Sequence, residues 1–452
     1  MKIFSKHAAV TLFDNILWTV AVALLLCFLP SSRAAAELVP KAIVFFGQGY
    51  EHSAGLLERS SLEAQHEKTN TALWPGLDLQ LMIRALEHYQ RIALQGGWPA
   101  IAPGRVMKRG FRDRRIPLLR WRLRLTGDLG SMAEQNSDLY DASLERAVKI
   151  FQMRHGLEAD GVVGPATLKA LNVPVEKRIE QIGLNLERLR SFLSRRRPRF
   201  LLVNSASSEL KVIEQDRSIL EMKAVVGRPD RATPICQSVI SYLEFNPYWY
   251  VPPTILREDI LPAVEREPDY LKRHRLRVFE INGKYQQELD PDKIDWALFR
   301  SNMTFYKIRQ DPGPWNALGR IKFIFPNRFG VYIHDTPARQ LFNKSQRHFS
   351  SGCVRVERPV DLAEYLLRGD RRWTRSRILA TINKVHRRVV RLPEPMPVFL
   401  VYWTAWMAVD GRVNFRDDIY GRDRLLARSR QNAEDYHASV QISCSIAAEN
   451  SL

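Results

Sequence analysis

Residues 348–355 read His-Phe-Ser-Ser-Gly-Cys-Val-Arg and follow an alternating segment, residues 331–334, that ends in a histidine. The alternation predicts a strand with Tyr332 and His334 on one face, and Cys353 comes 19 residues after this histidine. A thiol and a neighbouring imidazole are groups that nucleophilic acyl transfer uses. The two segments therefore predict a β-rich domain with a cysteine-based acyl-transfer site.

The expected chemistry depends on how the thiol is activated. A thiol attacks as the thiolate, and its free pKa of about 8.5 is lowered by a neighbouring imidazole or cation. We expect His334 to accept the thiol proton and return it to the leaving amine, while N–H groups around Gly352 and Cys353 stabilise the oxyanion. Arg355 is expected to hold the cysteine loop or a substrate carboxylate. His348 is a competing candidate for the base.

The period-two pattern continues on both sides of these segments. Strand-like runs rich in apolar residues lie at residues 200–203, 210–213, 222–226 and 320–325, with polar turns between them. A mixed stretch with Pro-rich edges, at about 252–314, interrupts the pattern, and we expect it to form a mobile lid. The β-rich domain is predicted over residues 199–423.

The N-terminal half is predicted to be helical. Residues 78–93 have helical spacing and are followed by two glycines, and residues 175–198 repeat apolar positions in steps of three and four. Between them, residues 116–174 form a compact helical unit in which Pro165 opens a helix. The Arg-rich stretch 105–124 is expected to be a solvated face. With the β-rich domain, this organisation predicts an α+β multidomain protein.

An export signal is predicted at the N-terminus. Lys2 and Lys6 precede an apolar run at residues 16–29, and three alanines follow at 34–36. The run is shorter than the roughly 20 residues that span a bilayer, but it suits a cleaved signal peptide over residues 1–36. We therefore expect the mature chain in the periplasm, with an uncleaved inner-membrane anchor as the alternative.

Composition and charge exclude several classes of protein. Hydrophobic residues make up 45% of the chain and charged residues 26%, as in a folded protein rather than a disordered or multi-span membrane protein. Lys plus Arg is 68 and Asp plus Glu is 49, a net charge of +19 that attracts anionic polymers. Because export argues against nucleic acid, a cell-wall or membrane polyanion is the expected partner.

Three cysteines remain after signal removal, namely Cys236, Cys353 and Cys444. They are too few for a disulfide scaffold, and the odd number leaves at least one thiol free or paired between chains. A disulfide between Cys236 and Cys444 stays open from the sequence.

Two resemblances to known families extend these expectations. Residues 147–172, with Phe151, Gly156 and Gly161, resemble the small three-helix peptidoglycan-binding module of many wall enzymes. A strand-ending histidine followed by Ser-x-Gly-Cys-x-Arg resembles the catalytic domain of the L,D-transpeptidases. Four flanking runs are similar to the large Gram-negative branch of that family: residues 245–252, 309–313, 316–320 and 415–421.

That branch implies an order of domains for this chain. It consists of a signal peptide (1–36), an N-terminal scaffold (37–115), a peptidoglycan-binding-like helical domain (116–174), a linking helix (175–198), a catalytic domain (199–423) with a capping subdomain inserted at about 252–314, and a C-terminal tail (424–452). The tail is polar and is predicted to lack structure.

The resemblance implies an acyl transfer without ATP, metal or other cofactor. Family members attack the peptide bond after the third residue, meso-diaminopimelate, of a tetrapeptide stem and release the terminal D-Ala. The side-chain amine of a second stem's diaminopimelate then resolves the thioester. On this chain, Cys353 is the implied nucleophile and His334 the implied base. The resemblance also implies acylation of the cysteine by carbapenems, and peptidoglycan stems and glycan as partners.

One position departs from the pattern of many members of the family. Ser351 stands where they have a second histidine immediately before Gly-Cys. The group that orients His334 is therefore open between Ser351 and the backbone beside Asp335.

Other reactions would use the same site. They are exchange of the terminal D-amino acid, lipoprotein attachment and hydrolysis by water, and only the acceptor distinguishes them. A rival of a different class is a non-enzymatic wall-binding protein, against which the intact set of His334, Gly352, Cys353 and Arg355 argues. The sequence predicts neither the oligomeric state nor protein partners in wall synthesis.

Overall fold

The computed structural model describes residues 74–131 and 136–430. The predicted signal peptide at residues 1–36, the first part of the scaffold, Cys444 and the end of the tail lie outside the described residues. Within the described part of the chain, no helix is both long and apolar enough to cross a membrane.

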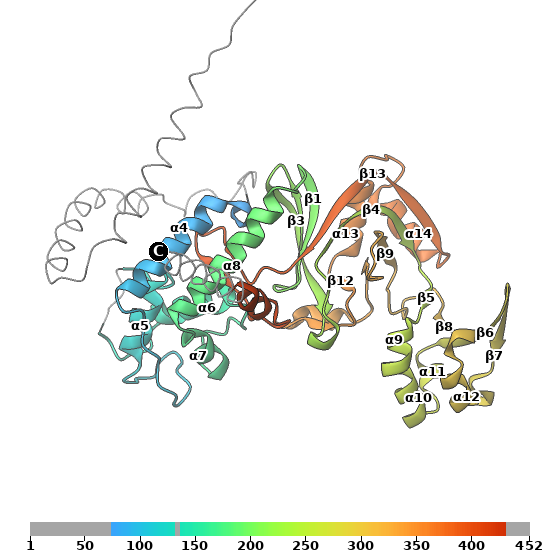
Figure 1. Cartoon of the computed structure of the whole chain (residues 1–452), viewed down its shortest axis with the longest axis horizontal. Coiled ribbons are helices and arrows are strands. Elements are labelled where there is room, and N and C mark those ends of the chain that lie inside the picture. The colour runs from blue at the N-terminus through green and yellow to red at the C-terminus, as the bar shows by residue number, and fades with distance from the viewer. Residues whose placement is uncertain (1–73, 132–135, 431–452) are drawn as a thin grey trace, which may run out of the picture. The chain divides into compact units, whose positions relative to one another are not determined.

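A mixed sheet of nine strands forms the centre of the C-terminal half (Figure 1). The strand order is β11-β3-β12-β10-β9-β4-β13-β1-β2, and β3 also pairs with β2, so the sheet closes on itself. The sequence patterns predicted β1, β2, β3, β9 and β10, although β10 is only 2 residues long, and they did not predict β4, β11, β12 and β13. The strands are β1 (Arg199–Asn204), β2 (Glu209–Glu214), β3 (Arg217–Gly227), β4 (Cys236–Phe245), β9 (Ile321–Ile324), β10 (Ile333–His334), β11 (His348–Ser350), β12 (Val354–Val356) and β13 (Arg388–Val401).

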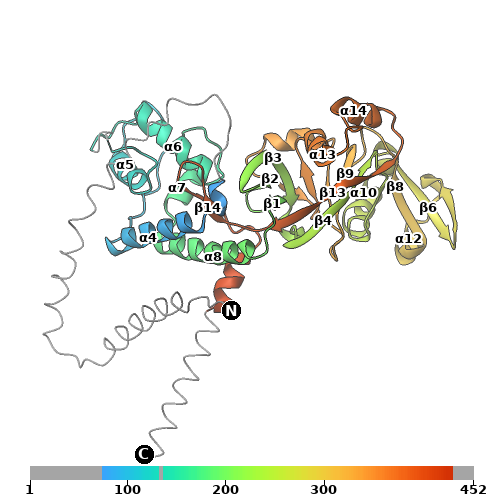
Figure 2. The ribbon, with the colours of Figure 1, turned by 90° about the horizontal axis from the view of Figure 1, so that it is seen from above.

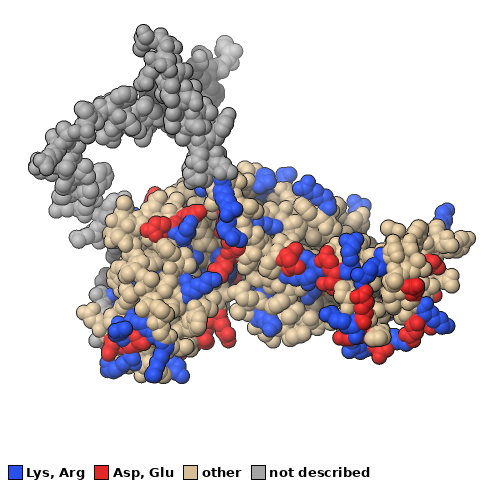
Figure 3. Space-filling view, turned by 60° about the horizontal axis from the view of Figure 1, so that its bottom comes forward, with Lys and Arg blue, Asp and Glu red and all other residues tan. Residues whose placement is uncertain are grey.

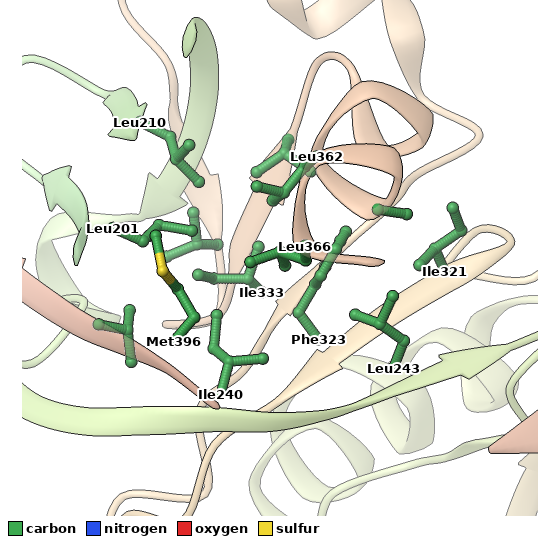
Figure 4. Close-up of a cluster of buried hydrophobic side chains, with 14 of the residues drawn as sticks. Leu201, Leu210, Ile240, Leu243, Ile321, Phe323, Ile333, Leu362, Leu366 and Met396 are labelled. Atoms are coloured by element: carbon green, nitrogen blue, oxygen red, sulfur yellow. The ribbon is translucent and has the colours of Figure 1, made fainter. Parts of the chain in front are cut away.

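Two helices pack against this sheet, α13 (Pro359–Leu367) and α14 (Arg375–Asn383). Leu362 and Leu366 of α13 extend toward the sheet residues Phe323 and Ile333 (Figure 4), and all four side chains are buried. Burying a side chain of this size contributes about 1.5–3 kcal/mol relative to leaving it exposed. This core holds β9 and β10 in place beneath the site described below.

The described N-terminal region is helical, as predicted. Its helices are α4 (Leu79–Leu94), α5 (Ile116–Leu125), α6 (Ala142–Arg154), α7 (Pro165–Leu171) and α8 (Val175–Leu193), and a short turn η2 (Pro75–Leu77) precedes them. The carboxylates of Asp78 and Asp141 cap α4 and α6 by accepting a backbone N–H. Helices α4 and α8 lie side by side (Figure 2), and β14 (Ala405–Met407), which pairs with β15 (Val413–Phe415), contacts both helices.

The prediction of a solvated face for residues 105–124 is wrong at two arginines. Arg120 and Arg122 are 0% and 1% exposed. Arg120 donates to the carbonyl of Leu139 at 2.7 Å, and the guanidinium of Arg122 lies 3.6 Å from the ring centre of Trp98. Carbonyls and rings from distant segments replace water around these cations, which the local spacing of residues does not reveal.

The insertion at about 252–314 is a folded subdomain. It has a four-stranded sheet of order β5-β8-β6-β7, and a core of its own that includes Leu271, Val278 and Phe299. Its elements are β5 (Trp249–Tyr250), α9 (Pro253–Ile255), η4 (Leu256–Ile260), α10 (Leu261–Arg266), α11 (Tyr270–Arg273), β6 (Leu276–Asn282), β7 (Tyr285–Leu289), η5 (Pro291–Lys293), α12 (Trp296–Ser301), η6 (Met303–Phe305) and β8 (Tyr306–Gln310). We refer to it as the cap.

The start of the predicted tail is structured. Residues 422–430 are helical, so the prediction that the chain lacks structure from residue 424 is wrong as far as residue 430. The carboxylate of Asp418 accepts the N–H groups of Asp423 and Arg424 at 3.0 and 3.1 Å, and it thereby satisfies donors at the start of this helix.

The net charge of +19 is not displayed as one uniform field on the face seen in Figure 3. There, Lys and Arg side chains are interspersed with Asp and Glu. Part of the basic charge is also paired inside the fold, as in the buried contact of Arg154 with Asp128 at 2.5 Å. The net charge alone therefore does not identify where an anionic polymer would bind.

Candidate active site

The short strand β10 places His334 in the centre of a row of basic side chains. Its antiparallel neighbour β9 puts Lys322 directly opposite His334, and its parallel neighbour β12 puts Arg355 on the other side. Directly paired residues direct their side chains to the same face of a sheet. Lys322, His334 and Arg355 therefore share one face across three adjacent strands.

Cys353 is held beside this row by its position just before β12. The N–H of Val354 donates to the carbonyl of Tyr332 at 3.0 Å, which ties the cysteine segment to the residue preceding β10. The ring of Tyr332 packs edge-on against the imidazole of His334, with 5.6 Å between ring centres. The side chain of Tyr332 also lowers the pKa of the Cys353 thiol, against the larger effect of burial.

A cavity of about 270 Å³ opens at this point. Its lining includes five of the seven residues predicted for the site, namely Tyr332, His334, Ser351, Cys353 and Arg355. The cap side is formed by Trp249, Pro252, Thr254 and Ile255. Catalytic-domain and cap residues thus enclose one space that contains both the thiol and the imidazole.

The other two predicted residues lie behind the cavity lining. Gly352 has a φ of +111°, which favours glycine, and its carbonyl accepts from the Thr233 hydroxyl at 2.9 Å. The carboxylate of Asp335 instead accepts the N–H of Arg320 at 2.8 Å. The N–H of Gly352 donates to the hydroxyl of Ser350 at 3.1 Å, so this group is engaged within the loop rather than free for the oxyanion role expected of it from the sequence.

His334 is a neutral imidazole in this environment. Burial lowers its pKa to about 3, and the positive charges of Arg355 and Lys322 act in the same direction. Nδ1 lies 2.5 Å from the carbonyl oxygen of Asp335. Of the two orienting groups considered from the sequence, the backbone of Asp335 is thus the one in contact, because the hydroxyl of Ser351 binds Arg231 at 3.0 Å.

The thiol of Cys353 is protonated at rest. Burial raises its pKa, and the opposing effects of Tyr332, Lys322 and Arg355 are smaller. The net direction is opposite to the lowering that the sequence led us to expect. Because the neighbours favour the thiolate while burial disfavours it, the sulfur is poised to lose its proton only when a base accepts it.

Two functional neighbours were missed by the sequence reasoning. The Nζ of Lys322 lies 4.0 Å from the ring centre of Tyr332, and its positive charge acts to lower the pKa of the Cys353 thiol. Arg231, in η3 (Pro229–Arg231), lines the cavity and forms ion pairs with Glu258 and Asp259 of the cap. Alternation over residues 320–325 places Lys322 on a strand face, but nothing in the local pattern indicates Arg231.

The competing base His348 is not brought to the cavity. It lies on β11, pairs with Val226 of β3 and is absent from the residues that line the space around Cys353. Burial lowers its pKa to about 4. Its role in the site is therefore structural support of the strand before the cysteine.

Cys353, just before β12, and His334, on the adjacent strand β10, thus line one cavity of a β-rich domain that follows a helical module. Residues 198–382 match the YkuD family, described as "L,D-transpeptidase catalytic domain", and residues 115–171 match a "Putative peptidoglycan binding domain". The chain therefore has an L,D-transpeptidase catalytic domain of the YkuD family and a peptidoglycan-binding domain. Both resemblances drawn from the sequence, and the α+β fold class, are confirmed.

Individual relatives match parts of the chain. A "Putative L,D-transpeptidase" of Haemophilus influenzae is 36% identical over 250 residues, which are 55% of this chain and 49% of that protein. The chain thus spans about half the length of the curated relative it matches. Among solved structures, the L,D-transpeptidase (residues 123–326) of Xylanimonas cellulosilytica is 15% identical, with 66% of this chain and 98% of that chain covered and a TM-score of 0.20. The L,D-transpeptidase of Mycobacterium smegmatis is 12% identical, with 45% and 58% covered and a TM-score of 0.22.

Proposed function

We propose that this protein cross-links diaminopimelate residues of two peptidoglycan stems through a thioester on Cys353. The observation that supports the proposal is the single cavity lined by Cys353 and His334, with Arg355 in the same wall and the cap opposite. A pure wall-binding protein does not require a half-buried thiol and a buried imidazole that line one cavity.

In the first half-reaction, His334 accepts the thiol proton while the sulfur attacks the carbonyl carbon of the third stem residue. A neutral imidazole is the form that accepts a proton, and burial favours that form here. The N–H of Cys353 stabilises the oxyanion. The peptide C–N bond then breaks, His334 returns the proton to the departing D-Ala amine, and a thioester remains.

In the second half-reaction, the diaminopimelate amine of another stem attacks the thioester carbonyl. His334 takes a proton from this amine, the C–S bond breaks and the sulfur recovers its proton. One peptide bond is broken and one is formed, so the transfer needs no ATP.

Two cations assist these steps. Lys322 and Arg355 flank the imidazole and favour the thiolate as it forms. The Nε of Arg355 is buried without a hydrogen-bond partner among the described residues, so this donor is available for a stem carboxylate.

The location and the handling of glycan belong to the same proposal. Residues 1–36 direct export to the periplasm, where the substrate is, and the peptidoglycan-binding domain holds the polymer near the catalytic domain. The cap limits access of water, because its residues Trp249, Pro252 and Ile255 form one wall of the cavity.

The test is intact-mass analysis of the mature protein after incubation with tetrapeptide muropeptides or a carbapenem, followed by analysis of the muropeptide products. We expect a covalent adduct and dimers linked between diaminopimelate residues. Cys353→Ala should lose both, whereas the matched variant Cys236→Ala, on β4 and outside the cavity, should keep both.

The same products separate the alternatives. Exchange of the terminal D-amino acid, lipoprotein attachment and hydrolysis would each give an adduct without dimers. Dimers formed by Cys353→Ala would contradict the thiol mechanism.

A further inference from the structure

A second cleft, of about 530 Å³, is separate from the cavity that contains Cys353. Helices α6, α7 and α8 contribute one side, and residues 345–346 and 415–417 contribute the other. None of its lining residues also lines the cavity of Cys353. The cleft therefore lies where the peptidoglycan-binding domain meets two segments of the catalytic half.

Arg178 is a buried cation in this cleft, and the carboxylate of Asp417 acts on it without forming an ion pair. It is 4% exposed, and no ion pair within the described ranges includes it. Its terminal nitrogens donate to Gln181 at 2.8 Å and to the carbonyl of Ala170 at 3.3 Å, but its Nε has no partner. An unpaired buried donor of this kind is costly, and an anionic ligand would satisfy it.

His155 places a hydrogen-bond acceptor in the same cleft. It is 8% exposed, and its Nδ1 lies 2.7 Å from the carbonyl oxygen of Phe151. This contact requires the proton on Nδ1, so Nε2, which is buried and has no partner, carries the lone pair. The imidazole stacks against Phe415 with 5.4 Å between ring centres, and the guanidinium of Arg178 lies 4.5 Å from the same ring centre.

The remaining charges do not neutralise this floor. Asp160 accepts from Gln152 at 2.7 Å and from the N–H of Val162 at 2.8 Å, and Glu158 and Asp417 are exposed. Two further cations line the cleft, the exposed Lys169 and the partly buried Arg416. A donor with positive charge and a neighbouring acceptor thus lie over one aromatic ring.

We propose that this cleft binds the carboxylate end of an acylated amino acid, with Arg178 donating to the carboxylate and His155 accepting the adjacent amide N–H. A carboxylate next to an amide N–H is found at the C-terminal residue of any peptide. Given the proposed function, the ligand is the terminal residue of a peptidoglycan stem. The cleft holds the stem while the cavity of Cys353 acts elsewhere on the polymer.

The experiment measures binding of a disaccharide-tetrapeptide to the full chain carrying Cys353→Ala, so that no turnover occurs. The probe with a free terminal carboxylate is compared with the same probe as its terminal amide. We expect the amide to bind at least tenfold more weakly. Adding Arg178→Gln should lower affinity for the acid at least tenfold and leave little difference between acid and amide.

Variants of exposed residues test the cleft without the risk that a buried substitution prevents folding. Ala166 is exposed at the rim of the cleft, so Ala166→Glu should weaken binding of the acid by charge repulsion, while Ala166→Lys should not weaken it. Arg190→Gln, an exposed change on α8 outside the cleft, is the matched control and should bind as the parent does.

Three results would overturn the inference. They are equal binding of acid and amide, no effect of Ala166→Glu, and equally tight binding of glycan strands stripped of peptides. Binding is measured in Cys353→Ala, so it does not depend on catalysis. If only the proposed function fails, the chain with Cys353 will bind the stem through this cleft but form no adduct.

Discussion

Lys322 and His334 face each other directly on the antiparallel strands β9 and β10. With Arg355 opposite on β12, the imidazole has a cation on each side. Two positive charges disfavour an imidazolium between them and favour a thiolate beside them. The two cations therefore offset part of the burial that raises the pKa of the Cys353 thiol, without a permanent imidazolium partner.

Removing the charge of Lys322 should make the thiol harder to ionise. For Lys322→Met, we expect the pKa seen in the pH profile of iodoacetamide alkylation to rise by about one unit, which slows alkylation near neutral pH roughly tenfold. Lys322→Arg, which keeps the charge, should stay near the parent. An unchanged profile in Lys322→Met would show that the lysine does not act on the sulfur.

The buried, neutral His334 should make stability depend on pH. Its folded pKa of about 3 lies below the unfolded value of about 6.5, so only the unfolded chain binds this proton between them. The stabilisation is complete above about pH 6.5 and is lost as the pH falls toward 3. Urea unfolding gives the free energy of unfolding at pH 7 and at pH 5. The decrease between these two pH values should be about 2 kcal/mol smaller in His334→Gln than in the parent.

The matched control for that measurement is His386→Gln, which changes an exposed histidine. It should show the parent's pH dependence. His348 remains in both variants, and burial lowers its pKa to about 4, so part of the dependence should persist. An identical pH dependence in His334→Gln and the parent would refute a neutral, buried His334.

The hydroxyl of Thr233 should be needed for the cysteine loop. It accepts the N–H of Gly227 at 2.8 Å and donates to the carbonyl of Gly352 at 2.9 Å, and all three residues are buried. Thr233→Val leaves both backbone groups unpaired, so we expect the free energy of unfolding to fall by about 1–3 kcal/mol. Thr233→Ser keeps the hydroxyl and should recover most of the loss, and equal losses would point to the methyl group instead.

The ion pairs of Arg231 should couple the cap to the site. This arginine binds Ser351 beside the nucleophile and pairs with Glu258 and Asp259. For Glu258→Gln combined with Asp259→Asn, we expect cross-linking to fall several-fold while iodoacetamide alkylation of Cys353 is kept. Glu267→Gln, elsewhere in the cap, is the control, and equal loss of both activities would mean that the contact supports the fold.

Much of the architecture was predictable from local patterns. Asp78 and Asp141 begin helices where a capping residue precedes a helical stripe, and alternation indicated β9 and the strand β10 that ends in His334. The motif around Cys353 and the histidine at the end of β10 led to the family that the comparison confirmed. These features depend on neighbours within a few residues along the chain.

Sequence by itself thus determined the main helices, part of the strands and the two resemblances to known families, and it predicted Cys353 and His334 as the reacting pair. Only the tertiary structure decided that Arg120 and Arg122 are buried, that Lys322 lies opposite His334 and that Arg231 reaches both Ser351 and the cap. Local spacing specifies which face of a strand or helix a residue occupies. The order of strands in the sheet and the packing of distant segments specify what that residue meets, because charge, burial and hydrogen bonding act through space.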